Sequence, residues 1–111
     1  MLAKQYRITD SEFSRFTKRA RYLRNDIFLV RYSPNRKDYS QFAVVVSTKV
    51  SKLATLRNRL RRVVRSWIEE SFSSMPKGYY IAIYINKTFR DTEKKVKKDN
   101  LFKIFGNIDS R

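Results

Sequence analysis

The longest regular pattern of apolar and polar positions lies between positions 49 and 72, a stretch without proline or glycine. At 100° per residue, its apolar side chains recur at the i, i+3, i+4 and i+7 spacing of a helix buried on one side. The members of this stripe are Leu53, Leu56, Leu60, Val63, Val64 and Trp67. The far side carries Asn58, Arg62, Arg65 and Glu69, and Arg57, Arg59 and Arg61 flank the stripe. The pattern predicts one long helix that packs its apolar stripe against a sheet.

Three runs rich in β-branched and aromatic residues predict strands at 27–32, 41–47 and 79–86. The second run, Q-F-A-V-V-V-S, is apolar almost without interruption, which predicts burial on both of its faces. The third follows a Pro-Lys-Gly breaker and is expected at the centre of the sheet. Because the long helix connects the second and third strands, these two are expected to pair in parallel within an otherwise antiparallel sheet.

Two further helices are predicted at the ends of the chain. Thr9 and Glu12 have the spacing of a capping box and begin a helix at 10–21. A lysine-rich helix is expected at 91–105, with Gly106 as its C-cap. The order helix, strand, strand, helix, strand, helix predicts an α+β fold, a two-layer α/β sandwich with a small mixed sheet. A length of 111 residues suits one domain over 1–111.

The charge of the chain indicates that it binds a negatively charged partner. The chain has 26 Lys and Arg against 10 Asp and Glu, a formal net charge of +16. So much like charge repels itself in a compact state, and a polyanion such as nucleic acid relieves the repulsion. The alternatives are a merely solvated basic surface and a basic protein that lies on a membrane. No apolar run approaches the roughly 18 residues of a membrane span, and no signal peptide is apparent, so a cytoplasmic protein without a membrane partner is expected.

The residues that the chain lacks restrict its chemistry. It contains no Cys, which excludes disulfides and thiolate metal sites, and no His, the commonest general base. A protein nuclease would need a carboxylate cluster to hold its metal ions. The pairs Asp91 with Glu93 and Glu69 with Glu70 are close in sequence but sit in ordinary helix-start and helix-surface contexts. A stand-alone nuclease is therefore disfavoured, and no metal site is expected in the protein.

The arginines of the long helix are the strongest functional signal. The segment at 57–65 reads R-N-R-L-R-R-V-V-R. A guanidinium group is a planar fork that binds phosphate through two hydrogen bonds and keeps its charge at neutral pH. Asn58 can bond a base edge or a ribose hydroxyl, or fix a neighbouring side chain. Pairs within the helix, such as Arg65 with Glu69, would use up only one or two of the arginines.

In its order of motifs the chain resembles the protein subunit of bacterial ribonuclease P. The R-N-R segment follows a strand that ends V-S-T-K at 46–49, as in that family. The resemblance continues in D-S-E-F-S-R-F at 10–16, F-L-V at 28–30 and Y-I-A-I at 80–83, and it covers the core of the domain, about 8–105. It implies a left-handed β-α-β crossover around the long helix, against the right-handed norm.

The resemblance also implies a function. The chain would be the accessory protein subunit of a ribonucleoprotein endoribonuclease and need no protein partner. It would bind the catalytic RNA and the 5′ leader of precursor tRNA and assist removal of that leader. The RNA would carry the chemistry with Mg²⁺ held mainly by the RNA, so no catalytic residue is expected in the protein. The alternative is a basic ribosomal or general RNA-binding protein without a role in tRNA processing.

Residue roles follow from the same resemblance. The contacts to the catalytic RNA would be Arg57, Asn58, Arg59, Arg61, Arg62 and Arg65. The contacts to the leader, in a cleft between the first helix and the sheet, would be Phe13, Phe16, Arg31, Tyr32, Ser47 and Lys49. Neighbours on a strand point to opposite faces, so the choice between Arg31 and Tyr32 stays open. For Phe13 and Phe16, packing against the sheet is the competing interpretation.

Overall fold

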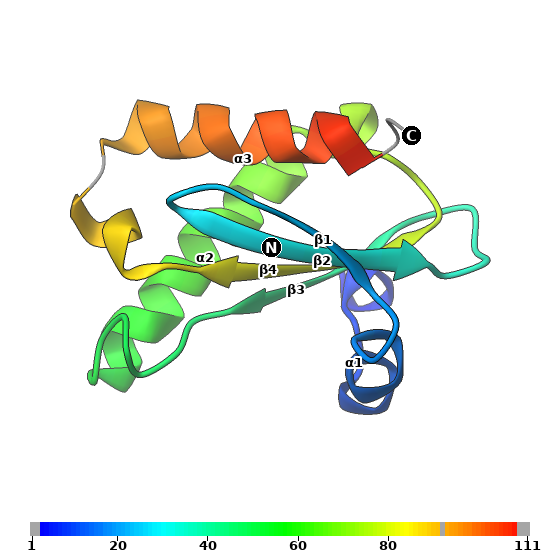
Figure 1. Ribbon diagram of the computed structural model, residues 1–111, viewed down its shortest axis with the longest axis horizontal. Coiled ribbons are helices and arrows are strands. Elements are labelled where there is room, and N and C mark those ends of the chain that lie inside the picture. The colour runs from blue at the N-terminus through cyan, green and yellow to red at the C-terminus, as the bar shows by residue number, and fades with distance from the viewer. Residues whose placement is uncertain (1–2, 92, 109–111) are drawn as a thin grey trace.

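The computed structural model describes residues 3–91 and 93–108 and shows a four-stranded sheet with three helices (Figure 1). The helices are α1 (Asp10–Phe16), α2 (Ala54–Glu70) and α3 (Lys94–Ile108). The strands are β1 (Arg21–Arg24), β2 (Phe28–Pro34), β3 (Gln41–Val45) and β4 (Tyr79–Ile85). Short 3-10 turns occur at Lys4–Tyr6, Phe72–Ser74 and Lys87–Asp91. Among the described helices, none is long and apolar enough to cross a membrane.

The sheet has the order β1-β2-β4-β3. Strand β4 pairs antiparallel with β2 and parallel with β3, while β1 and β2 form an antiparallel hairpin. This arrangement confirms the predicted α+β fold, the parallel pair and the central position of the last strand. The handedness of the connection through α2 stays a prediction.

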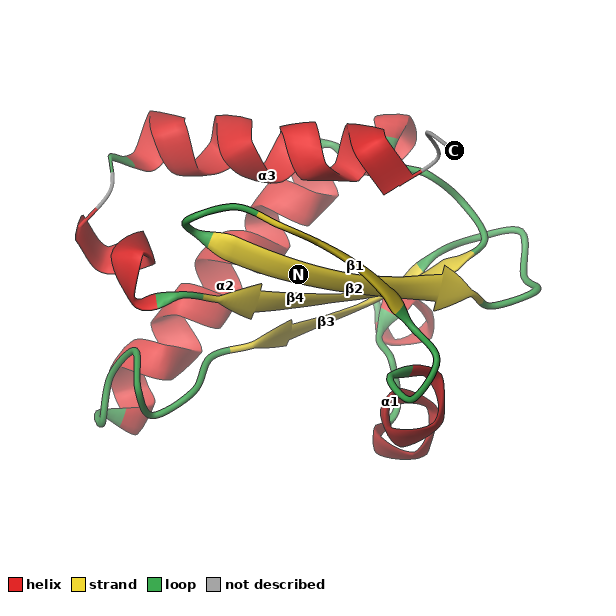
Figure 2. Ribbon diagram, in the orientation of Figure 1, coloured by secondary structure: helices red, strands yellow, loops and turns green. Residues whose placement is uncertain are grey.

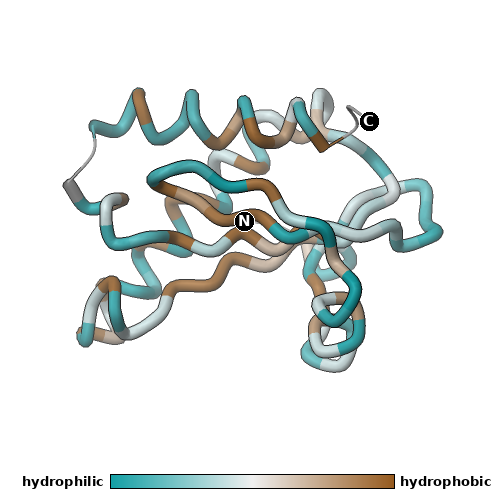
Figure 3. Tube along the Cα trace, viewed as in Figure 1, coloured by the Kyte–Doolittle hydropathy of each residue, from teal (hydrophilic) through white to brown (hydrophobic). Residues whose placement is uncertain are grey.

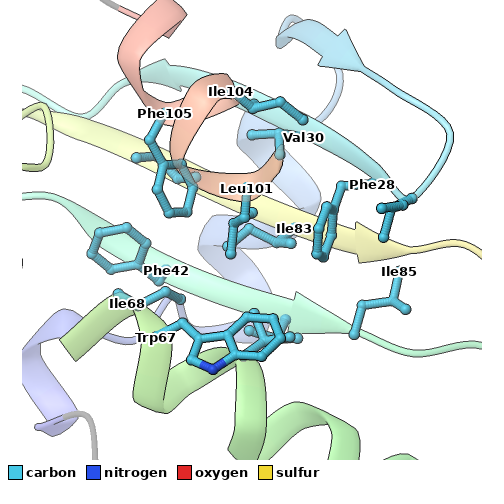
Figure 4. Close-up of a cluster of buried hydrophobic side chains, with 14 of the residues drawn as sticks. Phe28, Val30, Phe42, Trp67, Ile68, Ile83, Ile85, Leu101, Ile104 and Phe105 are labelled. Atoms are coloured by element: carbon cyan, nitrogen blue, oxygen red, sulfur yellow. The ribbon is translucent and has the colours of Figure 1, made fainter. Parts of the chain in front are cut away.

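The core lies between one face of the sheet and the pair α2 and α3 (Figure 4). Alternate residues of β2, β3 and β4 point to this face, among them Phe28, Val30, Phe42, Ile81 and Ile83. Helix α2 adds Val64, Trp67 and Ile68, and helix α3 adds Leu101, Ile104, Phe105 and Ile108. Each such side chain contributes about 1.5–3 kcal/mol on burial. This packing fixes α2, so the side of α2 away from the sheet is held rigid.

The other face of the sheet is covered only in part. Helix α1 lies against it, on the side of the sheet opposite α3 (Figure 2). The predicted capping box is confirmed: the Thr9 hydroxyl accepts a hydrogen bond from the Glu12 N–H at 3.2 Å, and the Glu12 carboxylate accepts one from the Thr9 N–H at 2.9 Å. Phe16 is buried beneath the helix. Because α1 has only seven residues, much of this face, over β1 and β2, is left without a helix.

The N-terminal third differs from the sequence-based prediction. The helix expected at 10–21 ends at Phe16, and after a turn at 17–20 the chain forms strand β1, so three strands and not two precede α2. Strand β1 is short and carries arginine at both ends, which hides it from a search for apolar alternation. It exists because β2 offers it a hydrogen-bonding edge. The expected order of elements was therefore wrong by one strand.

Three further expectations were wrong in detail. Strand β3 is hydrophobic after Gln41 (Figure 3), yet its burial alternates from Phe42 onward, because Ala43 and Val45 face the side that α1 covers only in part. Helix α2 begins at Ala54, so Leu53 is its N-cap and is 65% exposed, outside the buried stripe. Helix α3 runs three residues past the expected end, and Gly106 lies inside it rather than at its C-cap.

Candidate RNA interface

The arginines of α2 and the asparagine among them form a basic surface, here called the α2 arginine face, which consists of Arg57, Asn58, Arg59, Arg61, Arg62 and Arg65. Asn58, Arg59 and Arg62 are exposed, and the other three are half-buried. The structure thus brings all six predicted docking residues onto one helix whose opposite side is held by the core. Their contact with RNA stays a prediction.

Within this face, side chains position one another. The Arg61 guanidinium donates a hydrogen bond to the Asn58 side-chain oxygen one turn earlier. Asn58 therefore fixes a neighbouring arginine, one of the roles that the sequence left open. Arg62 and Arg65 line a hollow of about 240 Å³ together with Ser66 and Glu69. Partial burial lowers the pKa of Arg65, and the positive charges of Arg7 and Arg61 lower it further. A phosphate in this hollow would relieve that repulsion.

Arg57 has a structural contact as well. Its guanidinium donates to the backbone carbonyl of Ser51 at 2.9 Å, and Arg90 donates to the carbonyl of Val50 at 3.4 Å. Two arginines from distant parts of the chain thus hold the connector that leads from β3 to α2. Arg57 therefore orients the start of the helix in addition to any contact with RNA.

The open face of the sheet forms a second surface, here called the cleft face, made by Phe13 and Phe16 of α1, Arg31 of β2, and Tyr80 and Tyr84 of β4. Phe16 stacks on Tyr80 with ring centroids 5.2 Å apart, and Phe13 lies 6.3 Å from Tyr84. The Arg31 guanidinium carbon lies 5.5 Å from the centre of the Tyr84 ring. A hollow of about 220 Å³ between α1 and the sheet is lined in part by Arg15, Phe16, Arg19 and Tyr80. Proteins that bind single-stranded nucleic acid commonly line their grooves with aromatic rings and positive charges of this kind.

Glu12 ties α1 to the sheet at one end of this cleft face. Besides its capping bonds, its carboxylate accepts hydrogen bonds from the Tyr80 hydroxyl at 3.4 Å and the Gln41 amide at 3.5 Å, and it lies 3.6 Å from the Lys37 ammonium. The backbone N–H of Thr9 is the largest cause that lowers the pKa of Glu12, and the Thr9 hydroxyl, Lys37 and Tyr80 lower it further against the opposing effect of burial. The ionised carboxylate therefore sets how α1 sits over β4.

The structure separates the predicted leader residues. Arg31 faces the cleft, whereas Tyr32 is 6% exposed on the opposite side of β2, where its ring lies 6.0 Å from that of Tyr79. The prediction of Tyr32 as a leader contact was therefore wrong, since its side chain belongs to the core. Phe16 is 6% exposed, which confirms the packing interpretation for that residue, while Phe13 is half-buried.

Ser47 and Lys49 lie beyond the end of β3. Both are exposed, and the Lys49 N–H donates to the Ser47 hydroxyl at 3.3 Å. Val45, two residues before Ser47, is the register partner of Tyr84. The two residues therefore lie just past the end of β3 that is next to Tyr84. Their contact with the leader stays a prediction.

Tyr80 and Tyr84 are the site residues that the sequence reasoning missed. The signal was present in Y-Y-I-A-I-Y-I, where isoleucines alternate with Tyr80, Ala82 and Tyr84. This pattern is typical of a strand with an aliphatic core face and a second face that carries the tyrosines. Burial raises the pKa of the Tyr84 phenol, against the opposing effect of Arg31, so the ring stays neutral. A neutral tyrosine offers a flat stacking surface and a hydroxyl donor.

The described residues do not form a metal site. No group of three His, Cys, Asp or Glu residues within the described ranges lies close enough to hold an ion. The side chain of Asp91, considered above for such a role, lies outside the described residues. Within these ranges the carboxylates are too dispersed to suit a resident Mg²⁺.

A small α+β domain with an arginine face on one helix and an aromatic, basic cleft on its sheet belongs to the class of RNA-binding proteins. The family model described as Ribonuclease P matches residues 2–109, and the chain therefore belongs to the ribonuclease P protein family. This confirms the resemblance found in the motifs.

Individual relatives agree. The chain is 34% identical over 85 residues to the "Ribonuclease P protein component" of Thermotoga petrophila, which covers 77% of this chain and 72% of that relative. It is 31% identical over 94 residues to the component of the same name from Clostridioides difficile, covering 79% and 82%. The solved structure of the RNase P protein from Thermotoga maritima superposes with a TM-score of 0.85 at 28% identity, over 94% of this chain and 98% of that one.

Family membership fixes the coarse function. The chain is an accessory protein component of a ribonucleoprotein endoribonuclease, its partner is the ribonuclease P RNA, and catalysis is carried by that RNA. The alternative of a ribosomal or general RNA-binding protein finds no support among the relatives.

Proposed function

We propose that this chain docks on the catalytic RNA through the α2 arginine face and holds the 5′ leader of precursor tRNA across the cleft face. It does so in the cytoplasm and so assists the cut that gives the mature 5′ end. The observation that carries the proposal is the cleft face itself, where Phe13, Tyr84 and Arg31 meet on the side of the sheet that α2 and α3 leave open.

The cleft suits an unstacked single strand better than a duplex. Every base has a flat face, so stacking on aromatic rings tolerates any leader sequence and contributes about 1–3 kcal/mol per base. Phe13 and Tyr84 supply rings from two different elements, and Arg31 adds a charge over one of them. Mature tRNA has no leader, so only the precursor gains these contacts.

The α2 arginine face suits folded RNA. Its guanidinium groups are carried by a helix whose opposite side packs into the core, and each can engage a backbone phosphate without reading a base. Neutralising phosphates releases counterions, which makes such binding strongly dependent on salt. In the complex, Mg²⁺ is held mainly by RNA phosphates and supplies the charge stabilisation for phosphodiester hydrolysis, while the residues of this chain bind and orient the two RNAs.

The leader proposal is tested by comparing precursor and mature tRNA with the reconstituted ribonucleoprotein. Phe13→Ala and Arg31→Ala should each weaken precursor binding about fivefold or more, in line with 1–3 kcal/mol per stacked base, and leave mature tRNA binding unchanged. Lys103→Ala, at an exposed position of α3 on the other side of the sheet, is the control and should change neither. If the preference for precursor survives both cleft variants, the leader does not lie on this face.

The docking proposal is tested by measuring the binding of the protein to the catalytic RNA, without tRNA, at several salt concentrations. Arg62→Ala and Arg65→Ala should each weaken binding and reduce the slope of log K against log salt by roughly 0.7–0.9 for the lost phosphate contact. The same Lys103→Ala variant should keep the full slope. Weaker binding with an unchanged slope would show that these arginines do not contact phosphates.

A further inference from the structure

Strand β1 adds an exposed aromatic ring to the cleft face. Tyr22 is 61% exposed, one of the few large apolar side chains in the described residues that the fold leaves in solvent. Its register partner on β2 is Arg31, and opposite residues of an antiparallel pair point to the same face. Tyr22 therefore stands beside Arg31 on the open side of the sheet, away from α2 and α3.

The ring continues a row that begins at α1. Phe13 lies near Tyr84, and Arg31 reaches over Tyr84 from β2. Tyr22 comes next, with its Cα about 5 Å from that of Arg31 across the strand pair. The row thus leads from beneath α1 to the free edge of the sheet, and its last ring is the most exposed.

The charges around Tyr22 favour a polyanion. Arg24 shares its face of β1, opposite Leu29, and Arg31 lies across from it. The side chains that β1 and β2 present on this face are Tyr22, Arg24, Leu29, Arg31 and Ser33, and no acid is among them. A flat ring between two guanidinium groups matches one nucleotide, whose base stacks while its flanking phosphates pair with arginine.

We propose that Tyr22 is a stacking platform for an unpaired nucleobase of the leader that has left the cleft, with Arg24 and Arg31 at the adjoining phosphates. The inference rests on the proposed function, since it takes the leader as the strand in the cleft. It adds a subsite at the edge strand, which only leaders long enough to pass Arg31 can occupy. Tyr22 would therefore make affinity depend on leader length.

The experiment measures binding of the reconstituted ribonucleoprotein to precursor tRNAs whose leaders are lengthened one nucleotide at a time. The affinity of the wild type should rise about tenfold at the leader length that first reaches Tyr22. Tyr22→Ala should lack this rise. Tyr22→Phe should keep the step, because stacking needs the ring and not the hydroxyl. Tyr22→Leu keeps an apolar side chain on the strand without the ring, and it should behave like the alanine variant. Val96→Ala, which trims an exposed apolar residue of α3, is the matched control.

The outcomes separate the inference from the function beneath it. If Tyr22→Ala and Tyr22→Leu keep the length step while Phe13→Ala abolishes leader binding, the Tyr22 subsite is refuted and the cleft stands. If neither Tyr22 nor Phe13 variants change precursor binding, the leader proposal itself fails. An equal loss for every leader and for mature tRNA would also overturn the inference, because it would mark Tyr22 as a structural residue.

Discussion

Leu53 occupies the N-cap of α2 without capping it. Its backbone is extended, with φ −80° and ψ 116°, as N-cap residues generally are, but it offers no side-chain acceptor to the first turn. The Ser51 hydroxyl accepts only the N–H of Leu53 itself, at 3.1 Å. Replacing Leu53 with Asn should therefore supply a missing hydrogen bond without changing the backbone.

The magnitude follows from comparing two variants. Leu53→Asn and Leu53→Ala lose the same apolar contact, which is small because the side chain is 65% exposed. They differ by the cap, which is worth about 1 kcal/mol and ranges from roughly 0.5 to 2. The asparagine variant should therefore unfold about 4 °C above the alanine variant.

Thermal and urea unfolding of the free protein at neutral pH measure this difference. Equal midpoints for the two variants would refute the N-cap assignment and with it the start of α2 at Ala54. Leu53→Asp extends the test to function. It should cap as well as Asn but weaken RNA binding at low salt, because a carboxylate beside the α2 arginine face repels phosphates.

Two other predictions concern contacts that hold the surfaces in place. Hydrogen bonds led by the Thr9 N–H lower the pKa of Glu12 below 4.5, so its stabilising effect is complete above that pH and is lost as pH falls through the lowered pKa. The free energy of unfolding, measured with urea at pH 7 and below pH 4.5, should therefore fall more between these conditions for the wild type than for Glu12→Gln. Arg57→Ala should cost about 1–2 kcal/mol in the same assay, because the Ser51 carbonyl loses a charged donor, whereas exposed Arg59→Ala should cost less than about 0.5.

The elements that the sequence revealed are those whose local pattern is long or chemically specific. Helix α2 combines an apolar stripe at helical spacing with a stretch free of proline and glycine, and Thr9 with Glu12 marks the start of α1 by the spacing of a capping box. Strand β1 had no such signal, since its existence depends on pairing with β2 and not on its own residues. A non-local cause of this kind leaves no local trace.

The candidate site shows the same division. The arginines of α2 could be found because one helix carries them all. The cleft face could be found only in part, because it joins side chains from three or more elements whose register is set by tertiary pairing. Arg31 and Tyr32 are adjacent in sequence, and only the pairing of Arg31 with Ala82 shows which of them faces the cleft. Tyr22 depended on a strand that the pattern did not predict.

The position of β4 has a consequence for the order in which the protein is made. It is the strand that joins β2 to β3, and it is synthesised after α2. Until Ile85 has been added, β3 has no neighbouring strand and the apolar stripe of α2 has only part of its partner surface. Domains generally fold as units during synthesis, so the arginine helix becomes rigid only when the chain is nearly complete. The catalytic RNA would therefore bind only chains whose synthesis is nearly complete, and chains that stop before β4 would not assemble into the ribonucleoprotein.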